Sequence, residues 1–397
     1  MNSNQQYNKL NPPINIPLSV PEIKGNEWDY VKECLDTNWV SYVGHYVNKF
    51  EEVMADYVGV QYAIATASGT AALHTALLVA GIQENDEVLV STLTFVAPVN
   101  AIRYVGAWPV FIDSEPKYWQ MDPNKVVDFL NQECRWKNGK LYNRLTGRQI
   151  KAILPVHILG HPVDINSIVE IARKFNLTVI EDAAESLGAK YYEKSVGDLG
   201  DISCFSFNGN KVVTTGGGGA LLTNNEEWAV RAKHLTTQSK QDSLEYVHDE
   251  IGYNYRMNNI AAAIGVAQME QIDSFIDKKR QIASMYFEGL QDLADCSLME
   301  EAKYAFSTFW LYTLLIHESA VDIDSRQVIR ELQEFGIQSR PLWRPAHRQK
   351  MFQDCVYYGA DCADSMNALG VQLPSSVGLQ IEEQEYVIQT LCSLLNR

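Results

Sequence analysis

The sequence predicts an α/β protein whose large domain holds a mostly parallel, mixed sheet and whose smaller carboxyl-terminal α/β domain follows it. Its 397 residues, 46% of them hydrophobic, suffice for two such domains. Between Tyr62 and Leu222, apolar runs of strand length alternate with stretches of helical periodicity. This alternation is typical of parallel strands with helices on both faces of the sheet. We expect residues 1–255 to form an amino-terminal segment and the large domain, and residues 256–397 the smaller domain.

The expected elements follow the periodicity of apolar residues along the chain. Two helices, at 21–36 and 46–58, precede the first strand. Strands of the large domain are expected at Tyr62–Ala65, Glu87–Ser91, Trp108–Ile112, Ala152–Val156, Thr178–Ile180, Ser203–Phe207 and Gly219–Thr223. Helices between them are expected at Thr70–Val79, Phe95–Tyr104 and Ile165–Phe175.

The smaller domain is expected to begin with a long helix. Helical spacing of apolar residues predicts one helix over residues 260–297, leading away from the large domain. Beyond it we expect a strand at Trp310–Ile316 and helices near 324–335 and 381–394.

Composition argues against several classes of function. A net charge of −16 disfavours a dedicated nucleic-acid-binding protein, although a local nucleotide pocket is compatible with it. The seven cysteines form no Cys-x-x-Cys pair and the eight histidines no His-Glu-x-x-His motif, so neither a disulfide framework nor a metal site is expected. No apolar run approaches the ~18 residues that span a bilayer. The polar residues 1–7 lack the pattern of a signal peptide, and we expect a cytoplasmic protein without membrane contact.

Residues 134–151 form a basic segment that resembles an insertion. The segment carries six lysines and arginines, and its Asn-Gly and Thr-Gly pairs are turn signals, so a surface hairpin is predicted. A solvated insertion is the favoured interpretation. A cationic contact to an anionic ligand or a neighbouring subunit is the alternative.

The stretch from Cys204 to Asn224 is the most informative part of the chain. It places Lys211 after an apolar run, among small, hydroxyl and glycine residues that lead into a second apolar run. Burial lowers the pKa of a lysine amine and frees it to attack carbonyl compounds, including the aldehyde of pyridoxal phosphate. A solvated lysine on a flexible loop is the alternative, and this stretch alone favours neither.

A candidate phosphate site lies at Ser68-Gly-Thr-Ala-Ala-Leu-His74, which follows an expected strand and opens a helix. Ser68 and Thr70 can cap the helix, and Gly69 lets the backbone approach a ligand closely. The free amides and the positive end of the helix dipole suit a phosphate. Alone, the motif favours an ordinary helix cap over a phosphate site, because many helices begin with such residues.

Three further residues lie at strand ends, where ligands bind in parallel sheets. Asp182 ends an apolar strand and could hold a pyridinium nitrogen protonated, or simply cap a helix. Phe95 follows Glu87–Ser91 and could lie flat on a planar ring, or belong to the core. Ser206 could donate to a phosphate, or bond to neighbouring backbone. Their fixed order, with the phosphate loop first and the lysine last, indicates a fold-type I pyridoxal phosphate enzyme.

The chain resembles the DegT/DnrJ/StrS nucleotide-sugar aminotransferases over nearly its whole length. Residues 200–211, the four consecutive glycines and the 134–151 segment resemble the LegC-type branch, which aminates UDP-linked 4-keto-6-deoxy-N-acetylhexosamines for bacillosamine-type and legionaminic-acid glycans. The matching stretches are Asn38-Trp-Val-Ser-Tyr-Val-Gly44, Val47-x-x-Phe-Glu51, Ser68-Gly-Thr-Ala-Ala-Leu-His74, Thr94-Phe-Val-Ala97, Glu181-Asp-Ala-Ala184, the Lys211 segment, Gly252-Tyr-Asn-Tyr-Arg-Met257, Trp343-x-Pro-x-His347 and Leu373-Pro-Ser-Ser376.

The resemblance implies a role for each matching residue. Lys211 would bind pyridoxal phosphate covalently and later move the proton, while Asp182 would pair with the pyridine nitrogen and Phe95 would stack on the ring. The phosphate would be held by Gly69, Thr70 and Ser206.

The resemblance also implies partners. Asn254 would reach the cofactor phosphate of the neighbouring subunit, because family dimers share their sites. Trp39, Val40, Ser41 and His347 would line the sugar-nucleotide cleft. L-Glutamate would first convert the cofactor to pyridoxamine phosphate. A UDP-linked 4-keto-6-deoxy sugar would then accept the amino group.

Two positions depart from the family pattern. Glu185 stands where many relatives have Gln or His near the phenolic oxygen of the cofactor, and an ionised glutamate there would disfavour the phenolate. Gly217 replaces an acidic residue of Gly-Glu-Gly-Gly relatives, which we interpret as branch variation. Two rival functions stay open: an aminotransferase for a dTDP- or GDP-linked keto sugar, and a non-catalytic regulator that senses the cofactor or a sugar.

Overall fold

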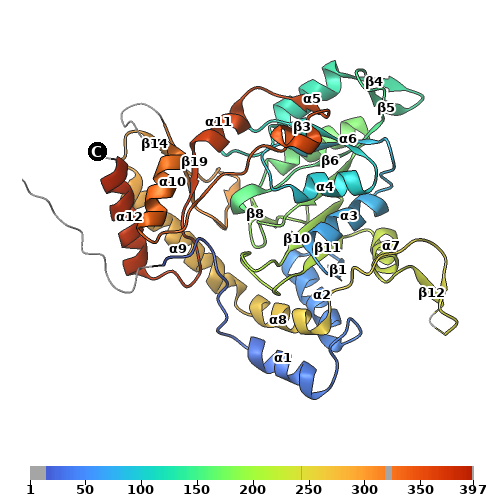
Figure 1. The fold of residues 1–397 in the computed structure, drawn as a ribbon. Helices are drawn as coiled ribbons and strands as arrows, with labels where there is room; N and C mark the ends of the chain where they lie inside the picture. Colours follow the sequence, from blue (N-terminus) through green and yellow to red (C-terminus); the bar gives the residue numbers. More distant parts are fainter. Residues whose placement is uncertain (1–14, 243, 318–323, 396–397) are drawn as a thin grey trace, which may run out of the picture.

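An eight-stranded sheet lies at the centre of the computed structural model, which describes residues 15–242, 244–317 and 324–395 (Figure 1). The polar start at residues 1–7 lies outside the described residues. The strand order is β1-β11-β10-β7-β6-β2-β3-β18, and β11 is the one of these eight strands that runs in the opposite direction to the other seven. In chain order the strands are β1 (Tyr62–Thr66), β2 (Glu87–Ser91), β3 (Trp108–Ile112), β6 (Ile150–Leu154), β7 (Thr178–Asp182), β10 (Ile202–Ser206), β11 (Gly219–Thr223) and β18 (Val356–Tyr358).

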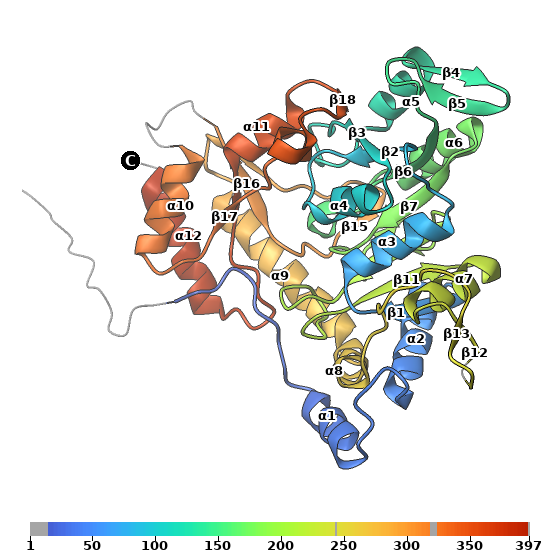
Figure 2. The same cartoon turned by 45° about the vertical axis from the view of Figure 1, so that its right-hand side comes forward.

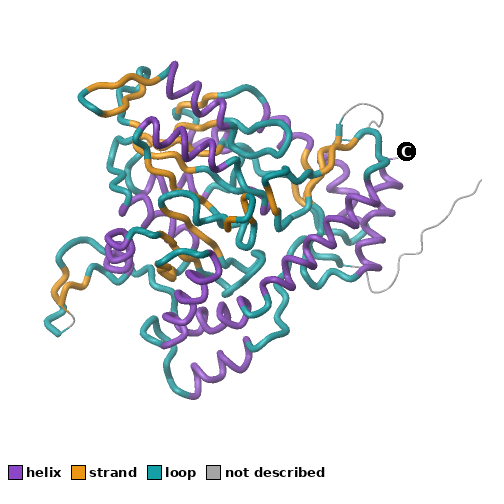
Figure 3. Tube along the Cα trace, turned by 180° about the vertical axis from the view of Figure 1, so that it is seen from behind, coloured by secondary structure: helices purple, strands orange, loops and turns teal. Residues whose placement is uncertain are grey.

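Alternate residues of the strands enter two different hydrophobic cores. On β2, Val88 and Val90 pack with side chains of α3 and α4, whereas Leu89 packs with side chains of α5 and α6. Seen from behind, helices flank both sides of the strands (Figure 3). A strand buried on both faces reads as a continuous apolar run, which is why the sequence predicted these strands well. The helices of this part are α2 (His45–Val58), α3 (Gly69–Val79), α4 (Ala97–Tyr104), α5 (Pro123–Gln132), α6 (Ile165–Phe175) and α7 (Glu226–Thr236).

The predicted long helix over residues 260–297 is wrong. The chain forms two helices, α8 (Asn259–Met269) and α9 (Ile272–Leu290), and then strand β14 (Cys296–Leu298). Contacts with α1 (Glu27–Asp36) and with Asn26, which precedes it, stabilise the break at Glu270. Tyr30 Oη and Asn26 Nδ2 each donate to the Glu270 carboxylate at 2.7 Å. These two residues lie 240 and 244 positions before Glu270 in the chain, so helical periodicity could not indicate the break.

A second, antiparallel sheet with the order β14-β16-β19-β17 lies beside α9, α10 and α12 (Figure 1). The expected strand at Trp310–Ile316 and the two expected helices are all present, with bounds that differ from the expected ones by at most three residues. Strand β18 leaves this part of the chain and pairs in parallel with β3 of the central sheet. The division into domains at residues 255 and 256 stays a prediction. The bounds here are β16 (Thr313–Ile316), β17 (Arg340–Pro341), β19 (Gly370–Gln372), α10 (Ser325–Glu334), α11 (Cys362–Leu369) and α12 (Ile381–Leu395).

The predicted basic hairpin is confirmed. Strands β4 (Cys134–Lys137) and β5 (Lys140–Asn143) pair across Asn138 and Gly139, whose φ angles of 51° and 72° are those of a type I′ turn. The hairpin projects from one end of the molecule, while β12 (Lys240–Asp242) and β13 (Val247–His248) project from another (Figure 2).

The base of the basic segment is anchored at the amino end of β2. The buried Glu87 carboxylate accepts hydrogen bonds from Asn143 Nδ2 at 2.9 Å and from Thr146 Oγ1 at 2.7 Å. This anchor lies at the opposite edge of the sheet from the carboxyl ends of the parallel strands. A contact of the hairpin with an anionic ligand or a neighbouring subunit stays a prediction. Within the described ranges, no helix is long and apolar enough to cross a membrane.

Candidate active site

The predicted site residues of the large sheet gather at the carboxyl ends of its parallel strands. Strand β7 ends at Asp182, and the neighbouring strand β10 ends at Ser206, with Cys204 paired to Asp182. Ser68 follows the end of β1, and Lys211 follows the end of β10. Ligands of open α/β sheets bind at this edge, so the topology brings the motifs together as the sequence predicted.

Lys211 lies on a closed loop and is largely withdrawn from solvent. The Phe207 amide donates to Gly218 O and the Thr215 amide donates to Phe207 O, both at 2.9 Å, which closes the loop that carries the lysine. The Lys211 side chain is 13% exposed, and its Nζ lies 3.4 Å from Glu185 Oε1. This geometry disagrees with the alternative of a solvated surface lysine.

Two buried acids flank Lys211. Burial raises the pKa of Asp182 to about 6 and also raises the pKa of Glu185, and the positive charge of Lys211 partly offsets both effects. Asp182 Oδ1 accepts a hydrogen bond from the Ala184 amide at 3.1 Å, and Glu185 Oε2 accepts one from the Leu159 amide at 2.9 Å. Each carboxyl group is therefore fixed by backbone, with Glu185 Oε1 directed at the amine.

The first turn of α3 and the end of β10 meet closely. Ser68 Oγ caps α3 by accepting from the Ala71 amide at 3.1 Å. A Cβ added to Gly69 would lie 2.7 Å from Ser206 Cβ and 3.1 Å from Ser206 Oγ. Thr70 lies in the same first turn. A serine hydroxyl beside an open helix amino terminus suits a phosphate, so these residues fit the phosphate group of the cofactor.

We expect Gly69→Ala to weaken binding of pyridoxal phosphate. The added methyl group collides with Ser206 and displaces its hydroxyl. A lost hydrogen bond to a charged group costs about 1.5–3 kcal/mol, or about 10- to 150-fold in affinity. Gly217→Ala is the matched control, because a Cβ there meets no atom within 4 Å. Titration of both cofactor-free variants with pyridoxal phosphate measures the effect; equal affinity in the two variants would contradict the assignment.

Two predicted residues reach this edge from elsewhere. Phe95 lies between β2 and α4 with 57% of its surface exposed, so its ring has a free face. His347 Nδ1 lies 2.6 Å from Thr92 Oγ1, just beyond the end of β2, and its ring stacks on Tyr357 at 4.0 Å. Burial lowers the pKa of His347, and the nearby Asp364 carboxylate opposes this effect. Asp364 Oδ2 lies 3.3 Å from His347 Nε2 but is not aligned for a hydrogen bond. The roles of Phe95 and His347 stay predictions.

The remaining predicted residues face solvent in the single chain. Trp39, Val40 and Ser41 form an exposed loop between α1 and α2, and Asn254 is exposed beside α7. Asn259 Nδ2 donates to Trp39 O at 2.6 Å, and the backbone amide of Asn259 donates to Ser41 O at 3.1 Å. The loop therefore has a fixed shape. Their predicted roles in a cleft shared between subunits stay predictions.

The sequence did not indicate that Trp310 and His157 lie beside the predicted site residues. The Trp310 ring centroid lies 3.9 Å from Lys211 Nζ, but the sequence showed this residue only as the start of an expected strand. His157 Nε2 lies 3.0 Å from Glu181 Oε2, and both side chains are fully buried on the side of β7 opposite Asp182. The His157 amide also donates to Asp182 O at 3.0 Å. A histidine and a glutamate at the ends of two separate strands carry no sequence signal of their contact.

Residues 21–392 match the DegT/DnrJ/EryC1/StrS aminotransferase family. The chain belongs to this family. The GDP-perosamine synthase of Escherichia coli O157:H7 is 42% identical over 95% of the chain and 97% of its own length, and that of Caulobacter vibrioides is 38% identical over 96% and 98%. A Bacillus subtilis protein, provisionally named the pyridoxal phosphate-dependent aminotransferase EpsN, is 39% identical over 96% of each. A solved family member from Brucella abortus is 25% identical, with a TM-score of 0.85 over 94% of the chain and 96% of its own.

Family membership confirms the fold class and the chemistry that the sequence predicted. The chain is a fold-type I, pyridoxal phosphate-dependent nucleotide-sugar aminotransferase. This result disagrees with the alternative of a non-catalytic regulator. The residues at the strand ends fit the cofactor, because a phosphate cradle, a buried carboxyl group and a shielded lysine lie at one edge of the sheet.

Proposed function

We propose that this aminotransferase moves an amino group from L-glutamate to C4 of a nucleotide-linked 4-keto-6-deoxyhexose. The observation that carries the proposal is the placement of Lys211, whose amine is largely shielded from solvent beside Glu185, at the strand end next to Asp182. A shielded amine between acids suits a group that both attaches a carbonyl cofactor and moves protons.

The residues of this chain would divide the work in the following way. Bound pyridoxal phosphate supplies an electron sink for the carbanion formed on the amino acid or sugar. The first turn of α3, with Ser206, would hold the phosphate group, and the Asp182 carboxylate would keep the ring nitrogen protonated. Lys211 Nζ would bind the cofactor, and once displaced would carry the proton to and from the reacting carbon.

Glu185 fits this scheme best in its protonated form. Burial raises the pKa of its carboxyl group, which favours the neutral acid. A neutral Glu185 could donate a hydrogen bond to the phenolic oxygen of the cofactor, as Gln or His would, whereas an ionised one would repel a phenolate. The Leu159 amide holds Oε2 in place, so Oε1 is the atom left to face the amine and the cofactor.

GDP is the first candidate for the nucleotide. The Escherichia coli and Caulobacter relatives are named GDP-perosamine synthases, and the alignment with the former covers almost the whole of both chains. UDP is the second candidate, because residues 200–211 and the run Gly216–Gly219 resemble the LegC-type branch.

A half-reaction decides between these nucleotides. The enzyme is converted with L-glutamate to its pyridoxamine phosphate form, and GDP-, UDP- and dTDP-linked 4-keto-6-deoxy sugars are then added separately while the yellow absorbance band is followed. We expect the band to return fastest with the GDP-linked sugar. Return of the band with the UDP-linked N-acetylated sugar alone would replace GDP by UDP. If none of the keto sugars restores the band, the proposed reaction is overturned.

The enzyme is proposed to act as a homodimer with shared sites. Exposed apolar side chains occur on the 38–43 loop and near Asn254, including Trp39, Val43, Leu244 and Ile251. A second copy of the chain would cover such surface and bring Asn254 to the neighbouring cofactor phosphate. Light scattering of the purified enzyme checks this, and a mass of one chain would contradict it.

A further inference from the structure

Lys279 is a fully buried lysine on α9 that the proposed mechanism does not use. Its side chain is 2% exposed, and within residues 15–242, 244–317 and 324–395 no carboxylate pairs with it. Its Nζ instead donates to two backbone carbonyls, Trp310 O at 2.9 Å and Ser375 O at 2.6 Å. Burial lowers the pKa of Lys279 to about 7. A neutral amine has two N–H donors, so both carbonyls stay satisfied whether or not the third proton is bound.

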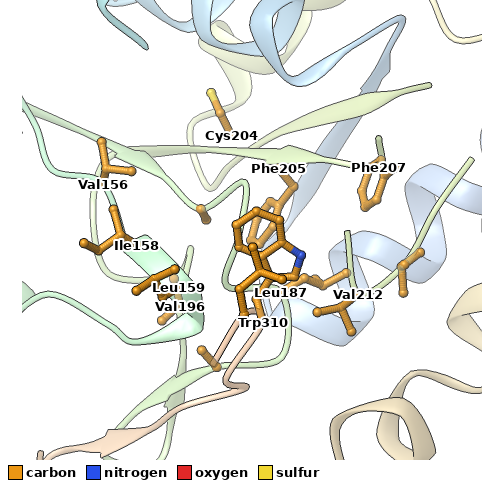
Figure 4. Packing of buried hydrophobic residues seen from close by; sticks show 14 of the residues in the cluster. Val156, Ile158, Leu159, Leu187, Val196, Cys204, Phe205, Phe207, Val212 and Trp310 are labelled. Carbon is orange, nitrogen blue, oxygen red and sulfur yellow. The ribbon is translucent and has the colours of Figure 1, made fainter. Parts of the chain in front are cut away.

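The contact with Lys279 is one of several that fix Trp310. The Trp310 amide donates to Leu159 O at 3.0 Å, and its indole Nε1 donates to Asn210 O at 2.7 Å. The indole also lies parallel to the ring of Trp343, with 6.4 Å between centroids and 8° between planes. Backbone and ring are thus both held, which leaves the indole a single orientation among the buried residues around it (Figure 4).

Trp310 in turn contacts Lys211 at two points. The indole face lies 3.9 Å from Lys211 Nζ, within the range of a cation–π interaction. The indole N–H bonds the carbonyl of Asn210, the residue immediately before Lys211. One side chain therefore fixes both the backbone that carries the lysine and the face from which its amine is shielded.

We propose that Lys279 and Trp310 are positioning residues that hold the Lys211 amine where it meets the cofactor. Lys279 fixes the backbone of Trp310 to the segment at Ser375, and Trp310 fixes Lys211. The inference rests on the proposed role of Lys211 and is independent of which sugar the enzyme accepts. A displacement of about 1 Å in a reacting group can reduce a rate by about 10²-fold, so a loosened indole should slow the reaction of the amine.

Capture of pyridoxal phosphate by the cofactor-free protein measures this effect. In that step the amine adds to the aldehyde and one water molecule leaves, and the yellow band reports the product. At a temperature where all variants are folded, we expect Lys279→Met to slow capture by about 10-fold or more and to change the circular dichroism of the bound cofactor. Lys278→Met is the matched control, because Lys278 is partly exposed and makes no hydrogen bond or ion pair with described residues.

Three further variants show whether Lys279 acts through Trp310. Trp310→Leu should slow capture at least as much as Lys279→Met, and Trp310→Phe, which keeps a ring but loses the N–H, should lie between Trp310→Leu and the wild type. The double variant Lys279→Met/Trp310→Leu should be no slower than Trp310→Leu alone, because residues acting in series are not additive.

Several outcomes would overturn the inference. A folded Lys279→Met protein with wild-type capture rate and circular dichroism would show that Lys279 contributes to the stability of the fold and not to the position of Lys211. If Lys279→Met does not fold, Trp310→Leu decides, and an unchanged capture rate there overturns the role of Trp310. Capture that follows these expectations while no keto sugar is accepted would leave this inference standing and overturn the proposed function instead.

Discussion

Lys211→Ala is expected to lose turnover by about 10³-fold or more. A positioned acid–base group contributes about 10²–10⁴-fold, and this variant also loses the amine that binds the cofactor covalently. The structure offers no substitute, because among the described residues Lys211 Nζ is the amine that lies beside Glu185 and under Trp310. The measurement is the steady-state rate of amino-sugar formation, together with the absorbance of the enzyme after addition of pyridoxal phosphate.

Lys194→Ala is the control for this experiment. Lys194 lies on the short strand β9 (Lys194–Ser195), is exposed, and belongs to neither the proposed site nor its supports. It should keep wild-type turnover. A Lys211→Ala enzyme that works within about tenfold of the wild type, well short of the 10²–10⁴ expected for this group, would contradict the role of Lys211.

Asp182→Asn is expected to change activity and stability in opposite directions. In the loaded enzyme, loss of one partner of a buried charge pair costs about 3–5 kcal/mol, which corresponds to about 10²–10⁴-fold in rate. Asparagine keeps the shape of the side chain and can still accept the hydrogen bond from the Ala184 amide. A fall in the rate of amino-sugar formation would therefore report the lost charge.

The stability effect appears in the cofactor-free protein and depends on pH. Because burial raises the pKa of Asp182 from 3.8 to about 6, its ionisation opposes folding fully above pH 6 and has no effect below pH 4. Asparagine removes a cost of about 3 kcal/mol. Urea denaturation should find Asp182→Asn more stable than the wild type at pH 8 and equal to it at pH 4. Equal stability at both values would mean that the carboxyl group is not desolvated, and would remove the physical basis for its pairing with a protonated ring.

The sequence predicted best what depends on local pattern. Strands β2, β3 and β11 and helix α6 have the predicted bounds, because each is apolar on the faces that the two cores cover. The basic hairpin followed from its Asn138-Gly139 turn. Motif residues at strand ends came together because parallel topology brings all carboxyl ends to one edge.

Features that depend on contacts between distant parts of the chain could not be predicted from the sequence. The interruption between α8 and α9 is held by Asn26 and Tyr30, and strand β18 joins the central sheet after a long return of the chain. Trp310 reaches Lys211 from 99 positions away and is one of eight tryptophans. Hydrophobic periodicity indicates an element and not its spatial neighbours, so it placed Trp310 at the start of an expected strand without indicating the amine that the indole covers.

Chemical labelling of the enzyme with bound pyridoxal phosphate identifies the lysine that holds the cofactor. The enzyme is mixed with pyridoxal phosphate and reduced with borohydride, which fixes the cofactor to the nitrogen that holds it, and digested peptides are analysed by mass spectrometry. We expect a single label on Lys211. A label on another lysine, such as the buried Lys279, or no label in an enzyme with bound cofactor, would contradict it.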